Sequence, residues 1–159
     1  MYTAVWSMDN DTQRVQFEVR MDPRLQVSNA DLQVQFDFLI RVRDTLSAVH
    51  RGIKRIRTIK SQLNAALGRT KDLDTTKTKK VKEIAKSITD TLTSIENEMV
   101  QTKAKAFQDL LNYPVKLNNK IASLAHVASS ADGRPTQQSM DRFDKLAATS
   151  TTYLNTMRS

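Results

Sequence analysis

The fold is decided by residues 32–67, which read LQVQFDFLIRVRDTLSAVHRGIKRIRTIKSQLNAAL. Apolar residues recur there in steps of three or four, the spacing of one face of an α-helix. Ser28 with Asp31 predicts a helix start with a capping box, and Gly68 is a typical residue just past a helix end. One helix is therefore expected over 28–67, with a buried stripe formed by Leu32, Phe36, Leu39, Val42, Leu46, Val49, Ile53, Ile56, Ile59, Leu63 and Leu67.

Three further helices are predicted, over 75–111, 115–131 and 136–157. The second should be stopped by residues 112–114, because the residue before Pro114 resists helical geometry. Its predicted buried stripe is Val81, Ile84, Ile88, Leu92, Ile95, Met99, Thr102, Ala106 and Leu110. The expected fold class is mainly α: a long antiparallel helical hairpin in an up-down four-helix bundle over residues 25–159. The two later helices are shorter, so the far end of the long hairpin should project.

Residues 1–24 have the period-two pattern of β-strands. Polar residues alternate with two apolar runs, which are Tyr2, Ala4, Trp6 and Met8, then Val15, Phe17, Val19 and Met21. Turn-forming residues at 9–12 separate the runs and predict a β-hairpin. Because a two-stranded hairpin is marginal alone, it should dock on the helices or on another chain. Tyr2, Trp6 and Phe17 are the candidate protein-docking residues, and the open strand edges could accept an added strand.

The net charge of +8 is concentrated in one quarter of the sequence. Residues 51–86 hold twelve basic and three acidic side chains, and antiparallel pairing is expected to bring 51–60 beside 77–86. Such a surface either binds an anionic partner or serves as a solvated face that keeps a projecting helix pair soluble. The candidate anion-binding residues are Arg51, Lys54, Arg55, Arg57, Lys60, Lys77, Lys79, Lys80, Lys82 and Lys86.

Residue types and spacings give no support to catalysis. The chain has no Cys, its two histidines, His50 and His126, lack metal-ligand spacing, and three glycines cannot form a phosphate-binding loop. The acidic pairs of the helices are expected on solvated faces. The sequence therefore predicts no enzyme activity, no cofactor and no metal. No run of residues is apolar enough for a transmembrane segment, and residues 1–13 lack a signal-peptide layout.

Three segments carry a family resemblance: FEVRMDPR at 17–24 with ADLQVQF at 30–36, LNYPVKLNNK at 111–120, and PTQQ at 135–138. Together they resemble the C-terminal region of large bacterial secreted proteins with a sortilin-like, Asp-box β-propeller, often described as glycosyl hydrolases. The resemblance implies a periplasmic or cell-surface location and a hairpin that is the remnant of a β-sandwich-like segment. It implies no catalytic residue, because the propeller is absent. Leu110 stands where that family usually has Pro, which favours a longer second helix.

These patterns lead to an expected function. The chain should be a non-catalytic structural or interaction module, an accessory subunit that docks on a larger extracytoplasmic or membrane-associated complex. Its basic tip should meet an acidic surface, either of a protein or of an anionic membrane. The alternative is a sequence-independent protein that binds the phosphate backbone of nucleic acid. No aromatic residue lies within 51–86, which disfavours binding by base stacking.

Overall fold

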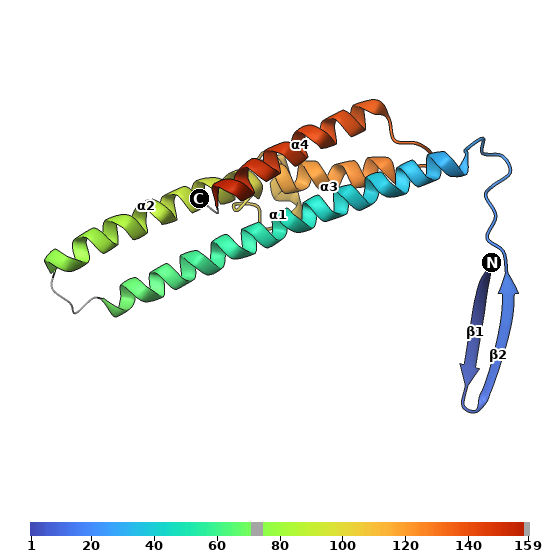
Figure 1. Ribbon diagram of the computed structural model, residues 1–159, viewed down its shortest axis with the longest axis horizontal. Coiled ribbons are helices and arrows are strands. Elements are labelled where there is room, and N and C mark those ends of the chain that lie inside the picture. The colour runs from blue at the N-terminus through green and yellow to red at the C-terminus, as the bar shows by residue number, and fades with distance from the viewer. Residues whose placement is uncertain (71–74, 158–159) are drawn as a thin grey trace.

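The computed structural model describes residues 1–70 and 75–157, except for the side chains of 75–77, Phe107 and Leu110 (Figure 1). Its elements are strands β1 (Tyr2–Met8) and β2 (Asp11–Phe17), helices α1 (Asn29–Arg69) and α2 (Thr75–Met99), the short 3₁₀ helix η1 (Phe107–Leu111), and helices α3 (Leu117–Ala128) and α4 (Gln137–Thr156). A mainly helical fold with four α-helices and an N-terminal β-hairpin is therefore confirmed.

Helix α1 begins as the sequence predicts and ends slightly later. The Asp31 backbone N–H donates to Ser28 Oγ at 3.1 Å, and the Ser28 hydroxyl donates to the Asp31 carboxylate at 2.6 Å. The predicted stop at Gly68 is wrong, because the helix continues to Arg69. Thr70 is the C-cap, and its backbone N–H and hydroxyl both donate to the Leu67 carbonyl oxygen. These bonds satisfy a carbonyl that the helix itself leaves unpaired.

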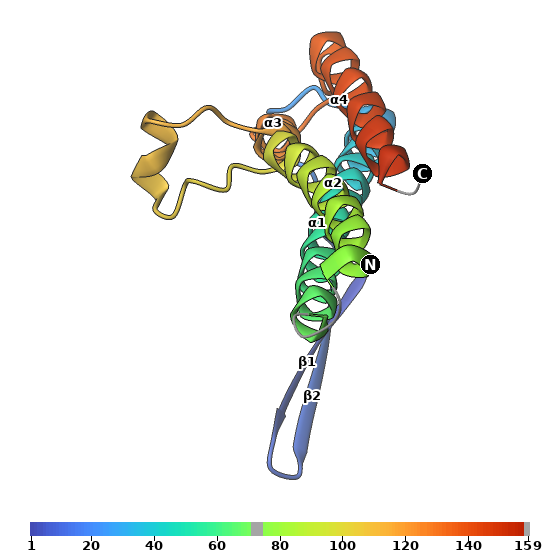
Figure 2. The same cartoon turned by 90° about the vertical axis from the view of Figure 1, so that its left-hand side faces the viewer.

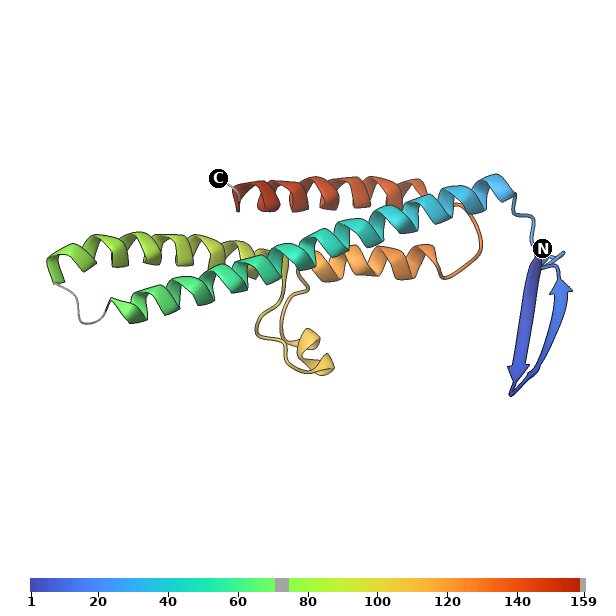
Figure 3. The same ribbon diagram turned by 60° about the horizontal axis from the view of Figure 1, so that its bottom comes forward.

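The helices are arranged around α1 in an asymmetric way. Helix α2 runs antiparallel to α1, α3 continues in the direction of α2 farther along α1, and α4 runs back beside them (Figures 1 and 3). The N-terminal part of α1 is thus surrounded by α3 and α4. As predicted, its C-terminal part projects, and among the described residues it pairs only with α2. This projecting part, residues 57–69 and 75–91, is called the arm below, and the rest of the four helices is called the inner bundle.

The core lies where α1, α3 and α4 meet and continues between α1 and the C-terminal end of α2. Phe38 and Phe143 are 3% and 2% exposed, and their rings pack edge to face with centroids 5.5 Å apart. The prediction of Phe36 as a core residue is wrong, since its side chain is 58% exposed. The buried positions of α1 follow Phe38 in helical steps, which leaves Phe36 on the flank. Gln35 is also buried and donates to two carbonyl oxygens, that of Ala128 at the end of α3 and that of Ala131 just past it.

Helix α2 ends at Met99, so the prediction of a helix over 75–111 is wrong. Residues 100–116 instead form an excursion that carries η1 and stands away from the helices (Figure 2). The Asp109 carboxylate accepts from the backbone N–H groups of Lys105 and Ala106, at 2.7 and 2.9 Å. Helix α3 occupies the surface of α1 that a longer α2 would need. Leu117, Ile121 and Leu124 of α3 are all buried, and they offer more apolar surface than the Thr102 and Ala106 of the predicted stripe.

The β-hairpin forms but does not pack on the bundle. The strands pair in register around a turn at Asp9 and Asn10, with Asp9 at φ 51°, a value that short turns of this kind require. The second strand ends at Phe17, short of the predicted Val19 and Met21. Every residue of both strands is exposed, and within the described residues neither strand contacts a helix. Docking on the chain's own helices is therefore not observed.

Candidate interaction surfaces

The basic candidates do not merge into one patch. Arg57 and Lys60 reach Glu96, and Gly52 lies beside Met99, so residues 51–60 run alongside the C-terminal end of α2. The predicted pairing of 51–60 with 77–86 is therefore wrong. The reason is that α2 begins beyond the end of α1 (Figure 1). Each residue of α1 therefore lies beside a later residue of α2 than the sequence predicts. The basic candidates thus form two separate runs, with that of α1 at the inner end of the arm and that of α2 nearer its tip.

The basic run of α2 lies nearest the tip of the arm. Lys79, Lys80, Lys82 and Lys86 are exposed, and none of them makes an ion pair with another described residue. The backbone of Lys77 belongs to α2, while its side chain lies outside the described residues. In the run of α1, Arg51, Lys54 and Arg55 are exposed. Arg51 and Arg55 border a small hollow in which Leu154 and Met157 of the C-terminal segment pack near Gly52.

Two of the candidates serve the fold. The Glu96 side chain is 6% exposed, and its two oxygens accept from Arg57 Nε at 2.6 Å and from Lys60 Nζ at 3.2 Å. Burial opposes ionisation of Glu96, but the two hydrogen bonds and the two positive charges outweigh it and lower the pKa of this carboxyl. This ion-pair cluster joins α1 to α2 at the base of the arm. It leaves Lys54 and the α2 lysines as the stronger candidates for an outside partner.

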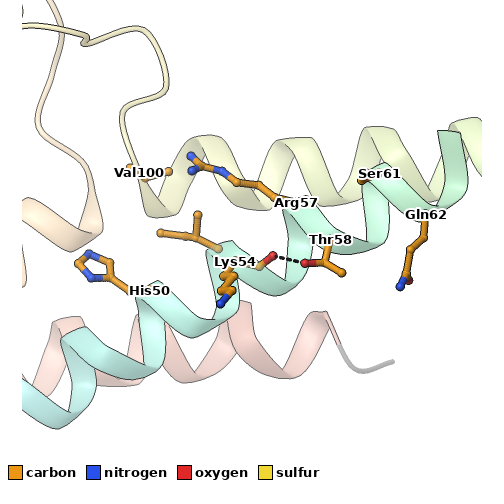
Figure 4. A pocket seen from close by; sticks show the side chains of 8 residues that line it. His50, Lys54, Arg57, Thr58, Ser61, Gln62 and Val100 are labelled. Atoms are coloured by element: carbon orange, nitrogen blue, oxygen red, sulfur yellow. Dashed lines mark hydrogen bonds between the residues drawn. The ribbon is translucent and has the colours of Figure 1, made fainter. Parts of the chain in front are cut away.

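A shallow groove of about 650 Å³ lies beside this cluster. Figure 4 shows side chains from one face of α1 along its floor and Val100 at its edge. The α1 face contributes residues three or four apart: His50, Ile53, Lys54, Arg57, Thr58, Ser61 and Gln62. Most carry a hydrogen-bond donor, and the Thr58 hydroxyl donates to the Lys54 carbonyl oxygen at 3.1 Å. Sequence reasoning found the bases but missed the groove, which depends on where α2 ends.

The apolar stripe of α2 is buried only in part, so the prediction that all of it lies in the core is wrong. Val81, Ile84 and Ile88 are 50%, 53% and 40% exposed, although the sequence predicts them in the core. They continue the face of Leu92, Ile95 and Met99, which is buried. The difference is that α4 ends near Gly52, so no third helix of the described chain covers the outer arm. The signal available in the sequence was length, because α4 is 20 residues long and α1 is 41.

The hairpin gathers the three predicted docking residues on one face. Tyr2 pairs with Phe17 across the strands, and their rings stack with centroids 5.9 Å apart. Trp6 lies on the same face, because side chains alternate and Trp6 is four residues from Tyr2. Tyr2 is 60% exposed, Phe17 is 46% exposed and Trp6 is 54% exposed. The hairpin therefore presents an apolar face that nothing in the described chain covers.

The described residues offer little to a metal or a membrane span. No group of three or more His, Asp or Glu side chains lies close enough together in residues 1–70 and 75–157 to hold a metal ion. His50 borders the groove, whereas His126 belongs to α3. None of the helices described has both the length and the hydropathy needed to cross a bilayer.

Comparison with known proteins adds no relative. No protein-family model, no curated protein and no solved structure matches this chain. The resemblance to the C-terminal region of sortilin-like propeller proteins stays a prediction.

Proposed function

We propose that this chain is a non-catalytic interaction module, an accessory subunit of a larger extracytoplasmic or membrane-associated assembly. The observation that carries the proposal is the position of two surfaces, at opposite ends of α1, that no other described part of the chain covers (Figure 1). A helix of 41 residues spans about 60 Å at 1.5 Å per residue. The bundle in the middle acts as a rigid spacer, the hairpin face docks on a protein, and the arm binds an acidic surface.

An acidic protein surface fits the arm better than nucleic acid does. Val81, Ile84 and Ile88 form an apolar strip on the helix that also presents Lys79, Lys80, Lys82 and Lys86. Apolar side chains gain free energy when they leave water against another apolar surface. The phosphate backbone of nucleic acid offers charge but no such surface. An acidic amphipathic helix offers both, so it satisfies the lysines and the strip together.

The test is a binding titration with poly-L-glutamate, duplex DNA and vesicles of anionic lipid as probes. The test variant carries Lys79→Glu, Lys80→Glu, Lys82→Glu and Lys86→Glu. The matched control carries Lys103→Glu, Lys105→Glu, Lys120→Glu and Lys145→Glu, four exposed lysines outside the arm. Both variants change the net charge by the same amount. Poly-L-glutamate should bind the wild type and the control, and it should bind the arm variant at least ten-fold more weakly.

The outcomes separate the candidate partners. Equal losses in the arm variant and the control would show that net charge alone drives binding, which contradicts a site on the arm. Binding to DNA only, with affinity falling linearly on a log–log plot against salt, would favour the nucleic-acid alternative. Binding to vesicles but not to poly-L-glutamate would shift the acidic partner from a protein to a lipid surface.

A further inference from the structure

The outer edge of β1 is an unprotected strand edge. The sheet has two strands, and no further described residue pairs with β1 on its other side. In an antiparallel pair, alternate residues direct their peptide groups to the partner strand, so the others direct theirs to the free edge. Natural proteins usually guard such edges with lysine, proline or a bulge. The sequence of β1, Tyr-Thr-Ala-Val-Trp-Ser-Met, contains no charged residue, no proline and no glycine.

We propose that β1 pairs with β1 of a second copy of this chain. The pairing is antiparallel about a twofold axis at Val5 and makes a four-stranded sheet in the order β2-β1-β1-β2. In this register Val5 meets Val5 of the second copy, and Thr3 meets Ser7. Because each pair joins two odd or two even positions, side chains that share a face in one hairpin share it in both.

The side chains of β1 are complementary to themselves in this register. On the apolar face, large Trp6 lies opposite small Ala4, and Tyr2 lies opposite Met8, a favourable contact between an aromatic ring and a sulfur atom. On the other face, Thr3 and Ser7 form a hydroxyl pair beside the two Val5 side chains. No charged side chain falls directly opposite another, so the like-charge penalty of cross-strand pairs does not arise.

Charge also decides which of the two free edges pairs. Strand β2 is centred on Arg14, so the same twofold pairing of β2 would place two arginines directly opposite each other. The basic arms of the two copies do not oppose the β1 pairing. They lie at the other end of α1, about 60 Å from its start, whereas salt at 0.1 M screens charge over about 10 Å.

The proposed sheet also accounts for a hairpin that stands free of the bundle. Two strands alone are marginal, whereas three or more strands with an apolar face can be stable. Pairing merges the two apolar faces into one, with Tyr2, Trp6 and Phe17 present twice. The larger face remains available to a partner protein, so the dimer and the docking function can be tested separately.

The experiment is disulfide trapping, which the absence of cysteine makes specific. In the proposed register the Cα atoms of the two Val5 residues are about 4.5–5.5 Å apart, within the range that a disulfide spans. Val5→Cys should therefore oxidise to a covalent dimer. The matched controls are Thr3→Cys and Ser7→Cys on the same face of the same strand. Thr3 of one copy and Thr3 of the other are about 13 Å apart along the strand, and the same holds for Ser7. Neither variant should therefore crosslink alone, whereas a mixture of the two variants should.

A second measurement does not depend on oxidation. Light scattering should give the wild type twice the 18.0 kDa chain mass, and Val5→Lys should give the single-chain mass because it sets two lysines opposite each other. Unchanged circular dichroism would show that the bundle still folds. The proposal is overturned if Thr3→Cys crosslinks as fast as Val5→Cys, since that is random collision. It is equally overturned if no variant crosslinks and the wild type remains at 18.0 kDa.

Discussion

The inner bundle and the arm are built from the same helix with the same apolar spacing, yet they bury it differently. Val42, Val49 and Ile56 of α1 are fully buried, whereas Leu63 and Leu67 farther along are half-buried. The contrast repeats on α2, where Leu92 is 6% exposed and Ile84 is 53% exposed. The period of the pattern is constant, and the number of neighbouring helices changes. Periodicity therefore specifies which face of a helix is apolar, and the surrounding helices decide whether that face is covered.

The largest effect is expected at the inner bundle. Phe38→Ala should lower the free energy of unfolding by about 3–5 kcal/mol, because it empties a packed site beside Phe143. Phe36→Ala, two residues away in the same helix, should change it by less than about 0.5 kcal/mol. Urea unfolding followed by circular dichroism measures both. Equal losses in the two variants would mean that α1 buries a different face.

The same comparison applies along α2. Leu92→Ala should cost about 2–5 kcal/mol of unfolding free energy, since its side chain belongs to the core. Ile84→Ala removes a similar side chain from the open arm and should cost less than about 0.5 kcal/mol. Thermal unfolding is a sufficient readout. A large loss at Ile84 would show that another surface covers the arm in solution, which pairing through β1 would not explain.

The ion-pair cluster at the base of the arm should have an intermediate effect. Glu96→Gln should cost about 1–3 kcal/mol, because a nearly buried carboxylate loses its charge and its two cationic donors lose their partner. The matched control is Glu98→Gln on the same helix. Glu98 pairs with Lys116 but is 53% exposed, so the control should cost at most about 1 kcal/mol. Chemical unfolding at neutral pH distinguishes the two.

This contribution should depend on pH in one direction. The folded state lowers the pKa of Glu96 below its ordinary value of 4.5, so the unfolded state binds a proton first as the pH falls. The extra stability of the wild type over Glu96→Gln should be complete above that value and should decrease as the pH falls through the folded-state pKa. Unfolding curves from pH 7 down to pH 3 measure the difference. A difference that grows on acidification would contradict a lowered pKa.

The two helical glycines of α1 should give the smallest effects. A Cβ atom at Gly68 on the arm would meet nothing within 4 Å, so Gly68→Ala should stabilise the chain by a few tenths to about 1 kcal/mol. A Cβ atom at Gly52 would lie 2.6 Å from Leu154 Cδ2, so Gly52→Ala must displace that side chain and should lose this gain. Melting temperatures of the two variants, compared with the wild type, are the measurement. A greater gain at Gly52 would mean that α4 packs less closely on α1.

Local signals in the sequence were sufficient for much of the fold. The Ser28 cap and the strand alternation around Asp9 both act within a few residues, and both are found in the structure. Local signals did not predict the end of α2. This helix stops at Met99 because α3, and not a longer α2, packs on the next part of α1. Local signals also did not show that α1 buries Phe38 and leaves Phe36 exposed. Both outcomes depend on which helix lies alongside.

The candidate surfaces, like the fold, were predicted only in part. Composition located the bases, and alternation located the apolar face of the hairpin. The register of α1 and α2 was not predictable, because it depends on how far α2 begins beyond the end of α1. That register assigns Arg57 and Lys60 to Glu96, opens the groove at Lys54 and leaves Val81 and Ile84 exposed.

The central claim is that the ends of the molecule bind partners and that the inner bundle does not. The most direct measurement is amine-reactive crosslinking with mass spectrometry in an extract of the cells that make this protein. Links to other proteins should concentrate on Lys79, Lys80, Lys82 and Lys86, while Lys103, Lys105, Lys120 and Lys145 should yield few. The charge-reversed control variant should keep the arm links. Links spread evenly over the arm lysines and these four comparison lysines, or found on the comparison lysines alone, would contradict the account.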